Sequence, residues 1–221
     1  MNIEIVSSAD GSHTLFLPDM NETYHSLHGA ITESRHVFID KGLDAVVKDD
    51  QPTRVLEVGF GTGLNALLTM AYAEKFRKKV IYHTLEPNPL PKEIWEKLNY
   101  TEKLSAPVSG FYERLHSLEW NSEMELSPYF TIKKINARLE EWETREEYDL
   151  VYFDAFAPGK QAEVWKLSNI EKCYRRVKAP GLLVSYCAQG QFRRDLQSAG
   201  FEVERLPGPP GKKEMLRAFK Y

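Results

Sequence analysis

Apolar and polar positions follow two alternating periods along most of this chain. Short apolar runs predict buried strands at Arg54–Val58, Val80–Glu86, Tyr129–Ile135, Asp149–Phe153 and Leu182–Tyr186. Apolar residues at helical spacing predict helices between them at Asn65–Arg77, Pro91–Leu98, Ala137–Trp142, Gln161–Val177 (one or two helices) and Gln191–Ala199. Because strands and helices alternate, we expect an α/β fold around a largely parallel sheet.

The C-terminal end of the chain departs from this alternation. Phe201–Leu206 and Lys213–Phe219 predict two consecutive strands joined by a Pro/Gly loop. Such a pair predicts an antiparallel edge and brings the expected sheet to seven strands. Residues 100–128 contain aromatic side chains but show weak periodicity, so they receive no assignment.

The N-terminal end also falls outside the repeating pattern. Thr14–Leu17 and Glu22–His25 flank a polar turn and predict a hairpin. A helix is predicted from Gly29 to about Asp40, with Gly42 as its stop. We therefore expect an N-terminal extension, residues 1–50, packed on a core domain, residues 51–221.

Composition narrows the class of protein. The chain has 221 residues, 42% of them hydrophobic, which is enough for one α/β domain with an added segment. A net charge of −3 excludes a generally basic nucleic-acid binder, although a local basic face stays open. The two cysteines, Cys173 and Cys187, form no metal-binding pattern and fit a reduced, cytoplasmic protein. The first residues show no signal peptide, and no apolar run is long enough to span a membrane.

The most informative stretch is Val55–Asn65, where a strand runs into three alternating glycines and then a helix. A dinucleotide site favours G-x-G-x-x-G, but Gly59, Gly61 and Gly63 form G-x-G-x-G. Glu57 precedes the first glycine, and its carboxylate would repel a pyrophosphate but attract a cationic amine. The stretch resembles motif I of the class I S-adenosylmethionine (SAM) methyltransferases, which have a Rossmann-like fold. The alternative is an ordinary strand–helix turn.

Polar residues follow the ends of the next strands. Ligands of open α/β sheets lie beyond the carboxyl ends of the strands. Glu86 lies 27 residues after Gly59, where an acid can accept the hydroxyls of a ribose. Asn136 could contact an adenine amino group, but a helix N-cap is an equal alternative.

The second informative stretch is Tyr152–Gly159, a buried strand that ends in Asp154 and continues with aromatic, small, proline and glycine residues. Methyl transfer from a sulfonium is an in-line displacement and needs a neutral nucleophile about 3–3.5 Å from the methyl carbon. Asp154 could attract an ammonium group, align it once it is deprotonated, and pass the proton to water. The alternative is that Asp154 caps the following turn.

Three histidines, His25, His28 and His36, lie close together in the N-terminal segment. No matching set of acids or cysteines accompanies them, so surface contacts are preferred to a metal site, and no metal is expected.

Longer stretches resemble one family. LEPNPLP at 85–91, DAFAPGKQAEVW at 154–165, PGPPGKKEMLRA at 207–218 and YHSLHGAITESRHVFI at 24–39 are similar to the bacterial tRNA wobble-uridine methyltransferases of the MnmD type. Members of this family also form the methyltransferase half of the two-domain MnmC enzyme. The resemblance covers essentially the whole chain, and its acceptor-side stretches are more distinctive than motif I.

The resemblance implies methyl transfer from SAM to the amine of 5-aminomethyl-(2-thio)uridine in the tRNA anticodon, with Asp154 beside that amine. It implies a uridine pocket shaped by Phe156 and Pro158. The implied SAM contacts are Glu57, Gly59, Phe60, Gly61, Gly63, Asn65, Glu86 and Asn136, with Tyr24, Ser26, Glu33 and Ser34 from the N-terminal segment. The chain ends at Tyr221 without an oxidase domain, so a separate enzyme is expected to supply the aminomethyl group.

A tRNA partner requires a local basic rim on this acidic chain. Lys212 and Lys213, in the C-terminal Pro/Gly loop, are the preferred phosphate contacts. Arg77–Lys79 and Arg175–Arg176 are expected to be solvated charges on helix faces. Other candidates for the rim are Arg35, His36, Lys160, Lys178, Arg193, Arg194 and Arg217.

Two rival functions share the same nucleotide pocket. One is a SAM enzyme that acts on a small-molecule amine, or an aminopropyltransferase-like relative, and the other is a nucleoside-binding module without catalysis. The presence of Glu57, Glu86 and Asp154 speaks against the second, and salt-sensitive affinity for tRNA would separate the first from a tRNA enzyme.

Overall fold

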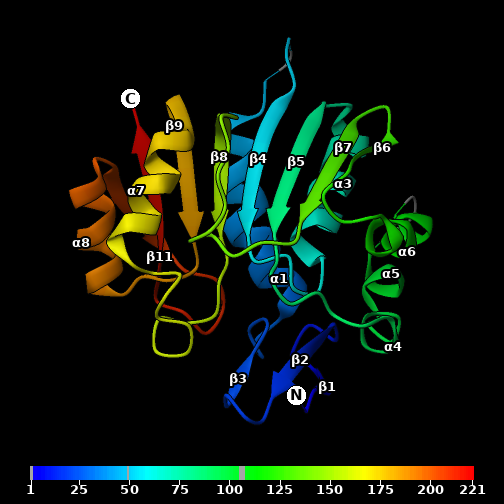
Figure 1. The fold of residues 1–221 in the computed structure, drawn as a ribbon. Helices are drawn as coiled ribbons and strands as arrows, with labels where there is room; N and C mark the ends of the chain where they lie inside the picture. Colours follow the sequence, from blue (N-terminus) through cyan, green and yellow to red (C-terminus); the bar gives the residue numbers. More distant parts are fainter. Residues whose placement is uncertain (1, 49, 105–107) are drawn as a thin grey trace.

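The structure is a computed structural model that describes residues 2–48, 50–104 and 108–221. A large twisted sheet forms the centre, with helices on both faces, and a small sheet lies beyond the carboxyl ends of the central strands (Figure 1). Among the described residues, no helix is both long enough and apolar enough to cross a membrane.

The central sheet has eight strands in the order β10-β11-β9-β8-β4-β5-β7-β6. Strands β7, β5, β4, β8 and β9 run parallel, whereas β6, β11 and β10 pair antiparallel with their neighbours. The strands span Thr53–Val58 (β4), Val80–Leu85 (β5), Glu123–Ser127 (β6), Phe130–Ile135 (β7), Tyr148–Phe153 (β8), Val177–Ser185 (β9), Glu202–Pro207 (β10) and Glu214–Lys220 (β11).

Different sets of helices cover the two faces of this sheet. One face packs on a helical run of α1 (Ala30–Ser34), a π-helix η1 (Arg35–Leu43) and α2 (Asp44–Val46), together with α3 (Leu64–Phe76). The other face packs on α7 (Leu167–Arg176) and α8 (Gly190–Ala199), in front of β9 in Figure 1. The short helices α4 (Lys92–Trp95), α5 (Tyr100–Lys103) and α6 (Ser109–Ser117) lie beside α3 at one edge. Both faces therefore bury a hydrophobic core, and the alternating strand residues supply it.

The expected α/β fold with parallel central strands is confirmed, but several details differ. The sheet has one strand more than the seven expected, because β6 forms within the unassigned residues 100–128. Ala137–Trp142 is a turn and not a helix; only Glu141 and Trp142 donate backbone N–H groups back to Arg138.

Gly42 does not stop a helix, because the helical run continues to Val46. A Cβ atom at Gly42 would lie 3.0 Å from Cγ2 of Val184, so this glycine allows η1 to approach the sheet closely. The expected hairpin exists as β2 (His13–Leu17) and β3 (Glu22–Thr23), and a further strand, β1 (Glu4–Ser7), pairs with β2.

Side chains of the turn between β1 and β2 accept hydrogen bonds from the first backbone N–H groups of α1. The backbone N–H of Ala30 donates to Ser8 Oγ, that of Ile31 to Ser12 Oγ, and that of Thr32 to Asp10 Oδ2. These N–H groups have no acceptor inside the helix, so the turn replaces a local N-cap. The N-terminal sheet is thereby tied to the helix that carries Glu33.

Candidate active site

A cavity of about 820 Å³ lies at the carboxyl ends of the central strands, and residues of the N-terminal sheet line one side of it. Its wall comes mainly from β2, β3 and Glu33 of α1, from the segments that follow β4, β5, β7, β8 and β9, and from one residue of the β10–β11 loop. Ten of the predicted site residues line it: Tyr24, Ser26, Glu33, Gly59, Phe60, Gly61, Glu86, Asp154, Phe156 and Lys212. Elements far apart in sequence therefore meet at the expected edge of the sheet.

The glycine turn forms the floor between two strand ends. Gly59 has φ 98° and Gly61 has φ 48°, both in the region that favours glycine. A Cβ atom at Gly59 would lie 2.5 Å from the carbonyl oxygen of Asp154, and one at Gly61 would lie 3.0 Å from the Tyr24 ring. The turn needs these glycines because backbone and ring approach it closely.

Glu86 joins the ends of β4 and β5. Its Oε2 accepts the backbone N–H of Gly61 at 3.0 Å, and its Oε1 accepts that of Asn88 at 2.8 Å. Burial raises the pKa of Glu86, and these two hydrogen bonds partly offset the rise. The carboxylate is thereby held in a fixed orientation on the cavity wall.

Glu57 lies behind the turn and is fully buried. Its Oε2 accepts the hydroxyl of Thr84 at 2.6 Å, whereas its Oε1 has no hydrogen-bond partner among the described residues. Burial raises the pKa of Glu57 to about 8, and the nearby Asp154 contributes to the rise. Burial thus favours the neutral form of Glu57, and a cation beside it would favour the ionised form.

Asp154 lines the acceptor side of the cavity directly after β8. Its Oδ2 accepts a hydrogen bond from Nδ2 of Asn65, at the start of α3, at 2.7 Å. Burial raises the pKa of Asp154 to about 7, although the bond from Asn65 and the charge of Lys212 lower it in part. Asn65 Oδ1 is left without a partner in the described part of the chain. The glycine-turn helix and the acceptor carboxylate are thus directly connected.

The loop after Asp154 is built around Phe156. Its backbone N–H donates to Gln161 Oε1 at 3.2 Å, and its carbonyl accepts Nε1–H of Trp165 at 2.7 Å. The Phe156 ring meets Tyr24 edge to face, with centroids 4.9 Å apart. Two aromatic rings from opposite sides of the cavity are therefore held in contact.

The N-terminal segment contributes a buried acid. Glu33 accepts the backbone N–H of Ser26 at 2.7 Å and forms an ion pair with Lys212. The Lys212 ammonium also lies over the ring of Tyr186, 3.8 Å from its centroid. The β10–β11 loop is in this way attached to α1.

Several predicted residues lie outside the cavity wall. Ser34 is fully buried in the core, and Lys213 is exposed. Asn136 is exposed and donates through Nδ2 to the carbonyl of Glu86 at 2.9 Å, so it is neither a helix N-cap nor part of the wall. Gly63, Pro158, Glu57 and Asn65 are also outside the wall, although Glu57 and Asn65 lie directly behind it.

Two sets of contacts that hold the cavity wall in place could not be predicted from the sequence. Lys172 donates to the carbonyl oxygens of Leu139, Glu140 and Trp142 and so fixes the turn that lines the cavity after β7. Phe60 packs against His116 and Trp120 from the unassigned region. No local pattern could have found these contacts, because each joins segments that are distant in the chain.

The three histidines occupy different environments. His25 is buried, His28 is exposed, and His36 Nε2 lies 2.9 Å from the carbonyl oxygen of Pro207. In the ranges that the structure describes, no group of three or more His, Cys, Asp or Glu side chains could hold a metal ion.

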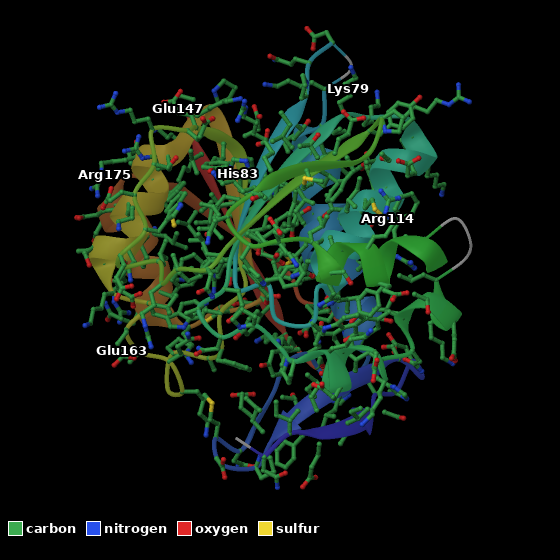
Figure 2. The ribbon with its side chains drawn as sticks, turned by 45° about the vertical axis from the view of Figure 1, so that its right-hand side comes forward. Lys79, His83, Arg114, Glu147, Glu163 and Arg175 are labelled. Carbon is green, nitrogen blue, oxygen red and sulfur yellow. The ribbon has the colours of Figure 1, made fainter. Side chains whose placement is uncertain are left out.

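The basic groups assigned to helix faces lie away from the cavity. Lys79 is at the end of the molecule opposite the N-terminal sheet, and Arg175 is on the outer face of α7 (Figure 2).

The donor set fits a nucleoside cofactor that carries an amino group and no phosphate. Glu86 presents oriented acceptors for hydroxyl groups, and Glu57 Oε1 and Asn65 Oδ1 are buried acceptors without partners among the described residues. Three acidic side chains, Glu57, Glu86 and Asp154, stand at or behind one wall. A cation in the cavity would favour their ionised forms, whereas a pyrophosphate would not.

Comparisons with known proteins agree with this chemistry. A family model described as S-adenosyl-L-methionine-dependent methyltransferase matches residues 96–221. The crystal structure of MNMC2 from Aquifex aeolicus is 28% identical, with a TM-score of 0.81 over 98% of this chain and 69% of that one. Spermidine synthase from Thermotoga maritima is 15% identical, with a TM-score of 0.56 over 98% of this chain and 72% of that one, and supports the fold alone.

Curated relatives include the tRNA 5-methylaminomethyl-2-thiouridine biosynthesis bifunctional protein MnmC from two organisms. The protein of Burkholderia multivorans is 29% identical over 92% of this chain, and that of Pseudoalteromonas atlantica is 29% identical over 96%. The chain spans about a third of the length of these relatives, 33% in both cases.

Proposed function

Because the chain belongs to the S-adenosyl-L-methionine-dependent methyltransferase family, we propose that it methylates the 5-aminomethyl group of (2-thio)uridine at the wobble position of tRNA. The product is 5-methylaminomethyl-(2-thio)uridine. The observation that carries the proposal is the direct bond between Asn65, on the glycine-turn helix, and Asp154, on the acceptor side of one cavity. The names of the curated relatives and of the Aquifex structure support the substrate.

In this proposal, one set of the predicted cofactor residues contacts the nucleoside and another favours the amino-acid end of SAM. Glu86 accepts the ribose hydroxyls, and the backbone at Gly59 and Gly61 lies against the nucleoside. Glu57 and Asn65, directly behind the wall, favour an ammonium group at the amino-acid end, because Glu57 Oε1 and Asn65 Oδ1 have no partner among the described residues. Bound SAM supplies an electrophilic methyl group on a sulfonium.

The acceptor residues act on the amine of the uridine. Asp154 attracts the amine as ammonium, and its pKa of about 7 lets it accept the proton that the amine must lose before attack. The neutral amine would then accept the methyl group that bound SAM supplies, and the remaining excess proton on its nitrogen would leave to water. Tyr24 and Phe156 provide the aromatic faces against which an extruded base stacks, and Pro158 borders the same loop.

The tRNA backbone is proposed to contact the exposed Lys213 on the β10–β11 loop. The supply of the aminomethyl group by a separate enzyme remains a prediction. The small-molecule amine alternative is not favoured, because its relatives, such as spermidine synthase, share only the fold.

The test uses tRNA isolated from cells that lack the wobble methyltransferase. After incubation with the protein and methyl-labelled SAM, digested tRNA is analysed by mass spectrometry, and the aminomethyl nucleoside is expected to gain one labelled methyl group. Asp154→Asn serves as the matched inactive control. Transfer to a free diamine with no transfer to tRNA would overturn the proposal in favour of the small-molecule alternative.

A further inference from the structure

The third glycine of the glycine turn is in contact with α6 and not with the cavity. Gly63 lies outside the cavity wall, whereas Gly59 and Gly61 belong to it. A Cβ atom at Gly63 would lie 2.9 Å from Nε2 of His116 and 3.0 Å from Cζ of Phe60. The absence of a side chain at Gly63 therefore leaves room for the His116 ring to reach the turn.

Thr62, between the last two glycines of the turn, is held by side chains of α5 and α6. Its carbonyl oxygen accepts the hydroxyl of Tyr112 at 2.9 Å and lies 3.0 Å from Nε2 of His116. Its Oγ1 accepts the hydroxyl of Tyr100 at 3.2 Å. Thr62 lines the cavity and is only 1% exposed. A carbonyl group at the cavity wall thus meets two side chains from a segment 50 and 54 residues further along the chain.

The His116 ring is fixed in place and carries a hydrogen on the nitrogen that meets Thr62. The ring stacks on Trp95, with centroids 4.6 Å apart, and the His116 carbonyl accepts Nζ of the buried Lys134 at 2.6 Å. Burial lowers the pKa of His116 to about 3, so the ring is neutral near pH 7. Since a carbonyl oxygen can only accept a hydrogen bond, Nε2 is the donor.

We infer that His116 and Tyr112 are positioning residues, which hold the Thr62 carbonyl and so keep the glycine turn in its cofactor-binding conformation before SAM binds. Glycines let the peptide groups of a turn rotate at little cost, so the turn needs external contacts to stay ordered. Glu86 fixes the Gly61 N–H from the side of β5, and the two α6 residues fix the next carbonyl.

An ordered turn raises the affinity for SAM, because the cofactor does not have to supply the free energy of ordering it. The inference therefore predicts that a helix beside α3, whose two donors lie behind the turn, sets part of the affinity for the cofactor. It rests on SAM as the cofactor and not on the proposed tRNA substrate.

The experiment is titration calorimetry of the full chain with SAM, in the absence of tRNA. His116→Gln and His116→Met form a matched pair, since both replace the ring with an unbranched side chain of similar length, but only the amide can donate. His116→Gln is expected to bind SAM within about twofold of the wild type, and His116→Met about tenfold more weakly. Tyr112→Phe removes only a hydroxyl and should weaken binding about three- to fivefold.

Tyr148→Phe is the control for the loss of a buried tyrosine hydroxyl. That hydroxyl lies 2.8 Å from Nδ1 of His83, and neither residue lines the cavity, so SAM affinity should stay unchanged. Equal affinities in His116→Gln and His116→Met, or wild-type affinity in Tyr112→Phe, would overturn the inference. If His116→Met fails to fold, Tyr112→Phe and the ring nitrogens of His116 still decide it.

Nitrogen-15 NMR of the His116 ring gives a readout that does not depend on binding. The SAM-free protein should carry the ring hydrogen on Nε2 near pH 7, with His116→Gln used to assign the signal, and a hydrogen on Nδ1 would overturn the inference. In turnover assays the KM for SAM should rise in His116→Met while kcat stays near the wild-type value. The expected SAM affinities without tRNA methylation would refute the proposed function and leave the positioning role standing, and methylation with unchanged affinities would do the reverse.

Discussion

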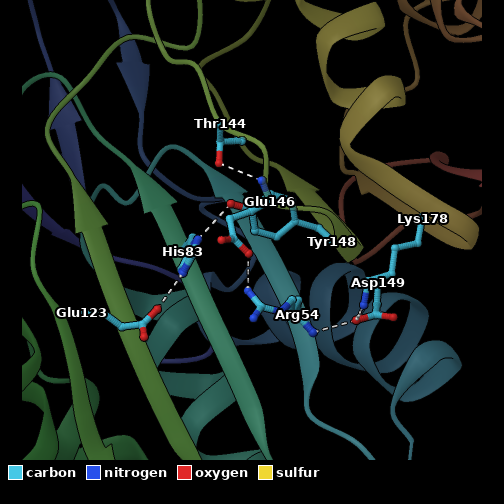
Figure 3. Close-up of polar contacts among 8 residues, drawn as sticks. All are labelled: Arg54, His83, Glu123, Thr144, Glu146, Tyr148, Asp149 and Lys178. Atoms are coloured by element: carbon cyan, nitrogen blue, oxygen red, sulfur yellow. Dashed lines mark hydrogen bonds and ion pairs between the residues drawn. The ribbon is translucent and has the colours of Figure 1, made fainter.

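Two aspartates lie at the two ends of strand β8, Asp149 within it and Asp154 directly after it, and they have opposite surroundings. Asp149, near the amino end, accepts the backbone N–H of Arg54 and forms an ion pair with Lys178 (Figure 3). It also forms an ion pair with Lys48. Asp154, at the carboxyl end, has one neutral hydrogen-bond donor, Asn65.

The pKa values move in opposite directions for this reason. Burial alone would raise the pKa of Asp149, but its three donors bring it below the usual range. Burial raises the pKa of Asp154 to about 7. The same residue type on the same strand is therefore a structural anchor at one end and a proton-accepting group at the other.

The largest expected effect is on methyl-transfer activity, which should fall when Asp154 is replaced but not when Asp149 is replaced. Asp154→Asn should lower methyl transfer about 10²–10³-fold, because the amine loses the group that attracts and deprotonates it. SAM affinity should stay within a few-fold, as measured by calorimetry. Asp149→Asn should retain its activity per folded molecule, and comparable losses in both variants would remove the functional distinction.

A second variant tests SAM binding at the carboxyl ends of the strands. Glu86→Ala should weaken SAM binding by about 1–3 kcal/mol, through loss of charge-assisted hydrogen bonds to the ribose. Titration calorimetry measures the change. Unchanged affinity would show that Glu86 only orders the turn through Gly61 and Asn88.

For the free energy of unfolding we expect the opposite order, with the larger effect at Asp149. Asp149→Asn should lower the free energy of unfolding by about 1–3 kcal/mol, measured by urea denaturation at neutral pH. Since the pKa of Asp149 is lowered, its contribution is present at neutral pH and is lost as the pH falls through and below 3.8. An equal loss in Asp154→Asn would contradict the contrast between the two ends.

The smallest effect concerns pH and Glu57. Its pKa rises from 4.5 to about 8 on folding, so its contribution is complete below 4.5 and is lost as the pH rises through 8. Glu57→Gln should therefore raise the melting temperature of the SAM-free protein by a few degrees at about pH 8.5 and change it less at about pH 5. A lower melting temperature at the higher pH would show that the ionised carboxylate has a stabilising partner.

The sequence predicted the elements whose signal is local. The strands β4, β5, β7 and β8 carry apolar runs that end at the glycine turn, Glu86, Asn136 and Asp154. The structure brings all four strand ends to one cavity, although Asn136 itself is not part of its wall. The turn at 137–142 was mistaken for a helix, because its carbonyls are held by Lys172 from a distant segment. Strand β6 escaped prediction since three of its five residues are exposed and give no apolar run.

Site residues at the strand ends could be predicted because each follows a local apolar run. The residues that contact them come from distant segments and could not be predicted. Glu33 and Lys212 are 179 residues apart in sequence, and only the fold shows that they form an ion pair. The role of Lys212 as a phosphate contact was proposed from its loop alone, without knowledge of that partner.

The turn that caps α1 from outside also has a practical consequence. Removing the first dozen residues, for instance to shorten an expression clone, would strip Ala30, Ile31 and Thr32 of their acceptors and let the first turn of this helix fray. Glu33 lies in that turn, so an affinity tag is better attached at Tyr221, which is exposed.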